Sequence, residues 1–313
     1  MLGAERIGWL VLVLVGWSCC QVAPATAQSP RSAAGENMSL TTKDGVRLKA
    51  TYYPSELGKE AVPVVMLHDY KESRTVFNGL AEALQNPPGG QRPSHAVITV
   101  DLRGHGESTS QQSPNGRTRE LETARLGKQD FRNMVLYDME AVRKFLVKKN
   151  DSGELNLNKL CLLGSGMGAN VATSWAAVDW STQNLANRKQ GQDVKALVLT
   201  SPEWNYSGLP LLKPLKHPGV RERISTLIIY GKKDSKAAKS AETVNKNLKR
   251  YHPDPPPGKG PEHKDLVLIA RPTSLQGTRL LTDPNFGMLP DLEFFLDARL
   301  SQQDYEWIQR RRQ

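Results

Sequence analysis

The sequence has little cysteine, no long hydrophobic run and few aromatic residues, and each shortage excludes a class of protein. Three cysteines among 313 residues exclude a fold held together by disulfides. No apolar run reaches the roughly 18 residues that a membrane-spanning helix needs. Hydrophobic residues still make up 38% of the chain and charged residues 24%, which is enough for a substantial core and excludes wholesale disorder.

The charge is positive, with 42 Lys and Arg against 32 Asp and Glu, a net charge of +10. These residues are spread along the chain and lack interleaved aromatic side chains, so we do not expect a nucleic-acid-binding protein. Residues 301–313 form a basic C-terminal tail that includes Arg310–Arg312 and Trp307. Such a tail either contacts an anionic envelope surface or is simply solvated.

The first residues are typical of a secretory signal peptide. Arg6 precedes an apolar stretch, Ile7–Trp17, and the small-residue site Ala25–Ala27 follows, so we predict a signal over 1–27 with cleavage after Ala27. Residues 28–37 are polar and predict a flexible leader. The protein is then secreted or periplasmic. Cys19 and Cys20 suggest a lipoprotein as the alternative, but Trp17 stands where lipidation favours a small residue.

The body of the chain, 38–300, alternates strand and helix patterns. Asp44-Gly45 predicts a hairpin between the first two strands, and the alternation that follows predicts a single α/β domain with a mostly parallel sheet and helices on both faces. Only Pro202–Ile224 separates two of the later strands, so we expect a minimal cap. The expected strands are Ser39–Lys43, Val46–Tyr53, Val62–His68, Ala96–Val100, Leu160–Leu163, Val194–Thr200, Thr226–Tyr230 and Leu266–Ala270, and the expected helices are Val76–Gln85, Asp130–Lys148, Met167–Val178, Ala237–Tyr251 and Leu289–Leu300.

Three segments carry a family resemblance. Val64–Tyr70 is similar to a strand and oxyanion turn, Asp101–Ser108 to an Asp-x-Arg-Gly-His-Gly-x-Ser stretch, and Leu162–Gly168 lies where a nucleophile elbow belongs. Together they resemble the α/β-hydrolase superfamily, in particular its lysophospholipase and serine aminopeptidase branch. In the first segment His68-Asp69 stands where that family usually has His-Gly. The resemblance implies the α/β-hydrolase fold over nearly all of the mature chain.

The elbow lacks its nucleophile. The Gly-x-nucleophile-x-Gly pattern needs small residues two positions before and after the central residue. Gly164 and Gly168 meet that rule only if the central residue is Gly166, which has no side chain to attack a substrate. The alternative nucleophile is Ser165. With Ser165 as the central residue, the bulky Leu163 and Met167 would stand at the two positions that need small residues.

The general base is also missing. The resemblance implies a His after the last strand, in a His-Gly-Thr step, and this chain has Gln276 there. Glutamine does not titrate near neutral pH and therefore cannot accept the proton. His263 precedes the last strand and substitutes only if that strand is misplaced. Asp234, in a Gly-x-x-Asp step, occupies the position of the acid, although it equally fits a helix cap.

Two backbone donors complete the implied site. The N–H groups of Tyr70 and Met167 match the oxyanion-hole positions, where they hold an anion or a carbonyl oxygen. No group of residues has metal-ligand spacing, and we expect no cofactor. Gly164-x-Gly166-x-x-Ala169 fits the dinucleotide fingerprint, but no acidic residue follows at the required distance.

The sequence therefore predicts an exported pseudo-hydrolase that binds a small-molecule or acyl ligand, or a partner, through a vestigial pocket. One alternative is an active serine hydrolase, of esterase, lipase or peptidase type, that uses displaced residues such as Ser165. The other alternative is a scaffold protein of the cell envelope.

Overall fold

The structure is a computed structural model that describes residues 35–113, 115–186 and 188–310. The predicted signal peptide, 1–27, lies outside these residues, as does most of the predicted leader. Glu36 and Asn37, which we assigned to the leader, belong to the first strand, where the Asn37 side chain accepts a hydrogen bond from the Thr51 hydroxyl at 2.8 Å.

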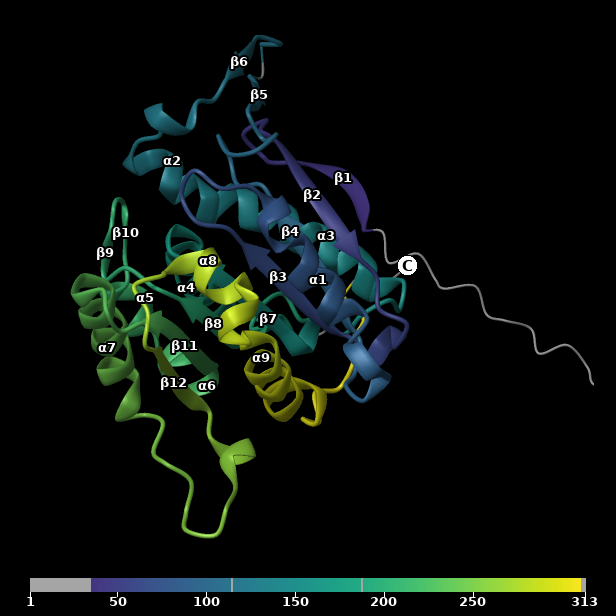
Figure 1. The fold of residues 1–313 in the computed structure, drawn as a ribbon. Coiled ribbons are helices and arrows are strands. Elements are labelled where there is room, and N and C mark those ends of the chain that lie inside the picture. The colour runs from purple at the N-terminus through teal and green to yellow at the C-terminus, as the bar shows by residue number, and fades with distance from the viewer. Residues whose placement is uncertain (1–34, 114, 187, 311–313) are drawn as a thin grey trace, which may run out of the picture. The chain divides into compact units, whose positions relative to one another are not determined.

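Eight strands form one sheet in the order β1-β2-β4-β3-β7-β8-β11-β12 (Figure 1). The β1–β2 and β2–β4 pairs are antiparallel and all other neighbours are parallel. The mostly parallel sheet and its N-terminal hairpin are thus confirmed. The strands are β1 (Glu36–Thr41), β2 (Arg47–Tyr53), β3 (Val62–Leu67), β4 (His95–Val100), β7 (Leu160–Ser165), β8 (Val194–Thr200), β11 (Ser225–Gly231) and β12 (Leu266–Arg271).

Helices cover both faces of the sheet because the central strands are buried along their whole length. Residues of α1, α8 and α9 join the apolar cluster on one face, and residues of α3, α4 and α7 join the cluster on the other. Figure 1 shows the first group on the viewer's side of the sheet. The helices are α1 (Asn78–Gln85), α2 (Lys128–Asn133), α3 (Met139–Asp151), α4 (Met167–Ser181), α5 (Leu212–Leu215), α6 (Pro218–Arg223), α7 (Ser235–Lys249), α8 (Gly277–Thr282) and α9 (Met288–Leu296).

Several short elements lie where the sequence predicts only loops. The hairpin β5 (Ser110–Gln112) and β6 (Thr118–Glu120) consists of polar residues that are half-buried or exposed, so it shows no hydrophobic alternation. The segment predicted as a minimal cap, 202–224, carries four short elements: β9 (Asn205–Tyr206), β10 (Leu209–Pro210), α5 and α6. None of the helices in the described ranges is long and apolar enough to cross a membrane.

The helix predicted over 130–148 is interrupted by a π-helical turn, Met134–Asp138. The last residue of this turn is buried and binds the arginine of the Asp-x-Arg-Gly-His-Gly-x-Ser stretch. Arg103 donates to Asp138 from its backbone N–H at 3.0 Å and from its guanidinium at 2.9 and 2.6 Å, and it also pairs with Asp44 at 2.7 Å. The stretch therefore serves the fold, because it ties the loop after β4 to α3 and to the first hairpin.

The C-terminal segment is bound at the end of the sheet where β7 and β8 begin. Side-chain amides of Asn150, Asn156 and Asn158 donate to backbone carbonyls of residues 305, 306 and 308. The side chain of Arg310 is only 2% exposed and pairs with the buried Asp193 at 2.8 Å. The expectation of an exposed basic tail is therefore wrong for Arg310, because a buried carboxylate requires a cation beside it.

Breaking the Arg103–Asp138 pair tests its contribution to stability. We expect Asp138→Ala to lower the free energy of unfolding by about 3 kcal/mol, since it leaves a buried guanidinium with one partner fewer. Glu222→Ala, which removes the exposed pair with Arg221, is the matched control and is expected to change stability by less than about 0.5 kcal/mol. Urea unfolding measures both, and equal effects would contradict a structural role for the pair.

Candidate active site

The turn between β7 and α4 has the form of a nucleophile elbow. Gly166 lies at its tip with φ 49° and ψ −113°, a conformation that glycine adopts without the strain other residues carry. Gly164 and Gly168 allow the close approach of strand and helix: a Cβ built on Gly164 would overlap the Gly168 backbone, and one on Gly168 would overlap the Leu67 carbonyl. The residue at the tip of the elbow is thus a glycine, and no side chain projects there.

Ser165 is the last residue of β7 and is fully buried. Strand alternation directs it to the same face as Cys161 and Leu163, which belong to the core cluster beneath α1 and α9. Its hydroxyl has no hydrogen-bond partner in the structure. No imidazole activates it, so it lacks the adjacent base that a nucleophilic serine needs.

The two backbone donors of the implied oxyanion hole converge on one oxygen. The N–H of Tyr70 donates to Asp69 Oδ1 at 2.7 Å, and the N–H of Met167 donates to the same oxygen at 2.8 Å. A substrate oxyanion would need these two donors. The chain's own carboxylate therefore occupies the hole.

The Asp69 carboxyl group also fills the space of the missing nucleophile. A Cβ built on Gly166 would overlap its carbon and both oxygens, and one built on Gly277 would lie 3.0 Å from Oδ2. The turn is held further by Glu72, which accepts a hydrogen bond from the Asp69 N–H at 3.0 Å and one from the Thr278 hydroxyl at 2.6 Å. One aspartate thus blocks both the hole and the position of attack.

The electrostatics of this carboxylate are balanced between burial and hydrogen bonding. Burial raises the pKa of Asp69, and the neighbouring charges of Glu72 and Glu203 raise it further, whereas the N–H groups of Met167 and Tyr70 lower it; the net pKa is raised. The two amides favour the ionised form, but they do not fully replace the lost water.

Gln276 precedes Gly277, which lies beside the Asp69 carboxylate, but its side chain bonds to Ser201 and to the backbone of Gly231. Its side-chain Oε1 accepts from the Ser201 hydroxyl at 2.6 Å and from the Gly231 N–H at 3.1 Å, and its Nε2 donates to the Gly231 carbonyl at 2.7 Å. All of these contacts suit an amide. Gln276 therefore joins the ends of β8 and β11 and the start of α8.

Asp234 caps a helix. Its Oδ1 accepts from the N–H groups of Lys236 and Ala237, each at 3.0 Å, in the first turn of α7. This is the second of the two roles that the sequence left open.

The histidines near the site are structural. His68 Nε2 accepts from the Leu102 N–H at 3.1 Å, so its proton is on Nδ1 and is donated to the Asp69 carbonyl at 2.7 Å. Burial and the neighbouring His105 lower the pKa of His68 to about 4, which keeps it neutral. His263 lies in the turn before β12, at the strand edge opposite to Gly166. No group of His, Cys, Asp and Glu in the described part of the chain is arranged to hold a metal ion.

Asp69 is the functional residue that sequence reasoning missed. The sequence does contain a signal for it, because Asp69 stands where the family that this chain resembles usually has the glycine of His-Gly. A substitution of glycine by aspartate beside the hole adds a carboxylate within reach of both donors. Only the side-chain conformation shows that the carboxylate folds back onto them.

A double-mutant cycle tests the steric exclusion between Asp69 and a side chain at position 166. We expect Gly166→Ala to lower the free energy of unfolding by about 3 kcal/mol, through backbone strain and overlap with the carboxylate. With Asp69→Gly present, about 1–2 kcal/mol of that loss should disappear. Equal losses in both backgrounds, measured by urea unfolding, would show that the two positions do not share space.

The raised pKa of Asp69 makes its contribution depend on pH. The native state binds this proton more tightly than the unfolded chain, so the group stabilises the fold below its unfolded pKa, and that stabilisation is lost as the pH rises through the folded value. Asn does not titrate and keeps an oxygen for both N–H groups. We expect the stability of Asp69→Asn relative to the wild type to increase from pH 4 to pH 7; a constant difference would contradict the raised pKa.

Comparisons with known proteins place this chain in a family. The family model for serine aminopeptidase S33 matches residues 59–262. No curated protein matches the sequence. Among solved structures, an esterase of Pyrococcus furiosus is similar over 86% of this chain and 92% of its own, with a TM-score of 0.59 and 16% identity.

Two further structures agree in fold. An esterase of Pyrobaculum calidifontis has a TM-score of 0.52 and 16% identity, over 85% of this chain and 84% of its own. An acylaminoacyl peptidase of Pyrococcus horikoshii has a TM-score of 0.54 and 11% identity, over 88% of this chain and 43% of its own. The fold is that of the α/β-hydrolases, and the chain belongs to the serine aminopeptidase S33 family.

Proposed function

We propose that this protein is a non-catalytic member of its family, a pseudo-hydrolase that binds a ligand or partner and does not hydrolyse it. The observation that carries the proposal is the Asp69 carboxylate on the N–H groups of Tyr70 and Met167. A carbonyl oxygen of a substrate needs the same two donors, and it would meet a carboxylate that is already bound to them. Substrate activation is therefore blocked even before the nucleophile is considered.

The remaining chemistry supports the same conclusion. Besides the oxyanion hole, acyl transfer needs a nucleophile, a base and an acid that orients the base. Gly166 supplies no attacking atom, Gln276 cannot take up a proton, and Asp234 is engaged with the first turn of α7. The three functions are thus lost by three different causes, and restoring one of them does not restore turnover.

The cellular setting of the proposal rests on the sequence. The pattern over residues 1–27 supports export, so we place the protein outside the cytoplasm, secreted or periplasmic. In that compartment we propose that it binds a small-molecule or acyl ligand, or an envelope component. We prefer ligand or partner binding to a purely structural scaffold role because the chain keeps the turn of the elbow, with Gly164 and Gly168 on either side of Gly166.

Labelling by a fluorophosphonate probe, which reacts with activated serines, tests the proposal. We expect no labelling of the wild-type protein and only slow labelling of the Gly166→Ser, Gln276→His double variant, since Asp69 still fills the hole. The triple variant that adds Asp69→Gly frees both N–H donors. Its labelling rate should exceed that of the double variant by about 100-fold, the typical effect of a hole donor.

The controls separate the alternatives. Ser165→Ala is the matched control for a displaced nucleophile, and wild-type labelling that Ser165→Ala abolishes would overturn the proposal in favour of an active serine hydrolase. Equal labelling of the double and triple variants would show that Asp69 does not obstruct the hole. Circular dichroism confirms that each variant is folded.

A further inference from the structure

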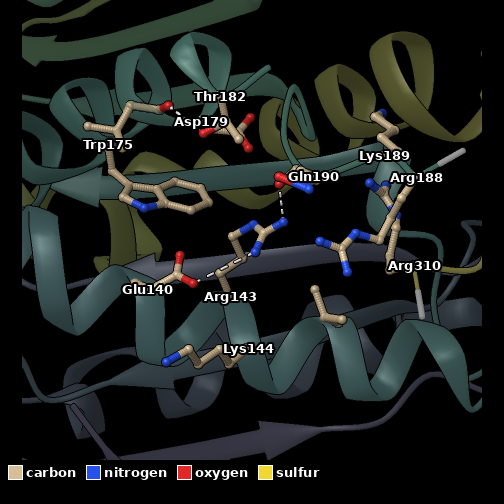
Figure 2. A pocket seen from close by; sticks show the side chains of 12 residues that line it. Glu140, Arg143, Lys144, Trp175, Asp179, Thr182, Arg188, Lys189, Gln190 and Arg310 are labelled. Atoms are coloured by element: carbon tan, nitrogen blue, oxygen red, sulfur yellow. Dashed lines mark hydrogen bonds and ion pairs between the residues drawn. The ribbon is translucent and has the colours of Figure 1, made fainter. Parts of the chain in front are cut away.

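A cavity of about 400 Å³ lies far from the elbow, between α3, the end of α4, the loop that follows α4, and the C-terminal segment (Figure 2). The lining residue Arg310 contacts Asp193, which precedes β8, and Asn158, which precedes β7. The cavity therefore borders the edge of the sheet at which these strands begin. Gly166 follows β7 at the opposite edge, about 20 Å away along a strand of this length. The two sites are therefore separate.

The cavity carries more positive than negative charge. Five basic and two acidic side chains line it: Arg143, Lys144, Arg188, Lys189, Arg310, Glu140 and Asp179. Figure 2 shows these side chains gathered around one space, with the ring of Trp175 beside it.

One buried carboxylate is shared among several of these cations. Asp193 is 2.8 Å from Arg310 Nη2, 3.5 Å from Lys189 Nζ and 3.9 Å from Arg143 Nε. Burial and the neighbouring Lys189 lower the pKa of Lys195, which lies in β8, to about 8. Three cations thus share one buried carboxylate.

Arg310 has unused hydrogen-bond donors in this surrounding. Its side chain is 2% exposed, and its Nη2 donates to Asn158 at 2.6 Å, but Nε and Nη1 have no partner in the structure. Buried donors of a charged group are costly unless they are satisfied. Arg310 lines the cavity, and a buried guanidinium with two unpartnered donors is suited to an anion with several acceptor oxygens.

We propose that this cavity binds a small organic molecule through a phosphate or sulfate ester group. The guanidinium groups of Arg143, Arg188 and Arg310 contact the anionic oxygens, because their planar forks match tetrahedral oxyanions. The organic part lies against Trp175, whose ring is part of the cavity wall. The site is independent of the oxyanion hole, so anion binding and probe labelling are separate readouts.

Calorimetric titration of the full protein at low salt with glucose 6-phosphate, glucose 6-sulfate, glucose and inorganic phosphate tests the proposal. We expect at least one ester to bind with a dissociation constant below about 1 mM and glucose not to bind. The tighter ester identifies phosphate or sulfate as the preferred group. Inorganic phosphate that binds as tightly as the esters would overturn the assignment of an organic ligand.

Variants locate the binding. Arg188 and Lys144 are exposed, so Arg188→Gln and Lys144→Gln should fold normally and weaken ester binding by about tenfold each. Lys239→Gln, an equally exposed cation on α7, is the matched control and should leave binding unchanged. Absence of ester binding to the wild type, unchanged affinity in Arg188→Gln, or an equal loss in Lys239→Gln would overturn the proposal.

Discussion

The proposed loss of catalysis depends on the contact of one carboxylate oxygen with two backbone N–H groups. Asp69 Oδ1 accepts from Tyr70 and Met167, the donors that stabilise the oxyanion in an acyl-transfer enzyme. The carboxylate belongs to the same molecule, so the hole is occupied without any substrate. The hole is satisfied in the resting state, and a substrate carbonyl has to displace a group that is covalently tethered beside it.

This contact explains why the elbow needs glycine at its tip. The Asp69 carboxyl group occupies the volume that a Cβ on Gly166 would require. A side chain at the tip and a carboxylate in the hole exclude one another, so the two departures from an active site form one arrangement. Gln276 adds a further departure, because its side-chain amide accepts from the Gly231 N–H and donates to the Gly231 carbonyl and cannot act as a base.

Much of the fold could be predicted from the sequence because it depends on patterns that are local in the chain. The buried strands are continuous apolar runs, and Val62–Leu67 and Leu160–Ser165 lie within a few residues of their predicted bounds. The hairpin Ser110–Glu120 could not be predicted, since its polar strands bury little. The burial of Arg310 was also hidden, because it depends on Asp193, which is remote in the sequence.

The site divides in the same way. Motif order was sufficient to locate Gly166 at the tip of the turn, and the backbone donors follow from that position. The conformation of the Asp69 side chain and the amide pairing of Gln276 depend on three-dimensional contacts between separate loops, and no spacing along the chain encodes them. Asp234 illustrates the limit, since the same residue satisfies a helix cap and a catalytic pattern, and only its contacts with the start of α7 decide between them.

The most direct test of the account is a pH titration of the backbone amide resonances by NMR. If the Asp69 carboxylate accepts from both N–H groups, the amide signals of Tyr70 and Met167 should shift together, with one common midpoint above the ordinary value of an aspartate. Amide signals that do not respond to pH, or that titrate with unrelated midpoints, would show that the hole is open and would contradict the central claim.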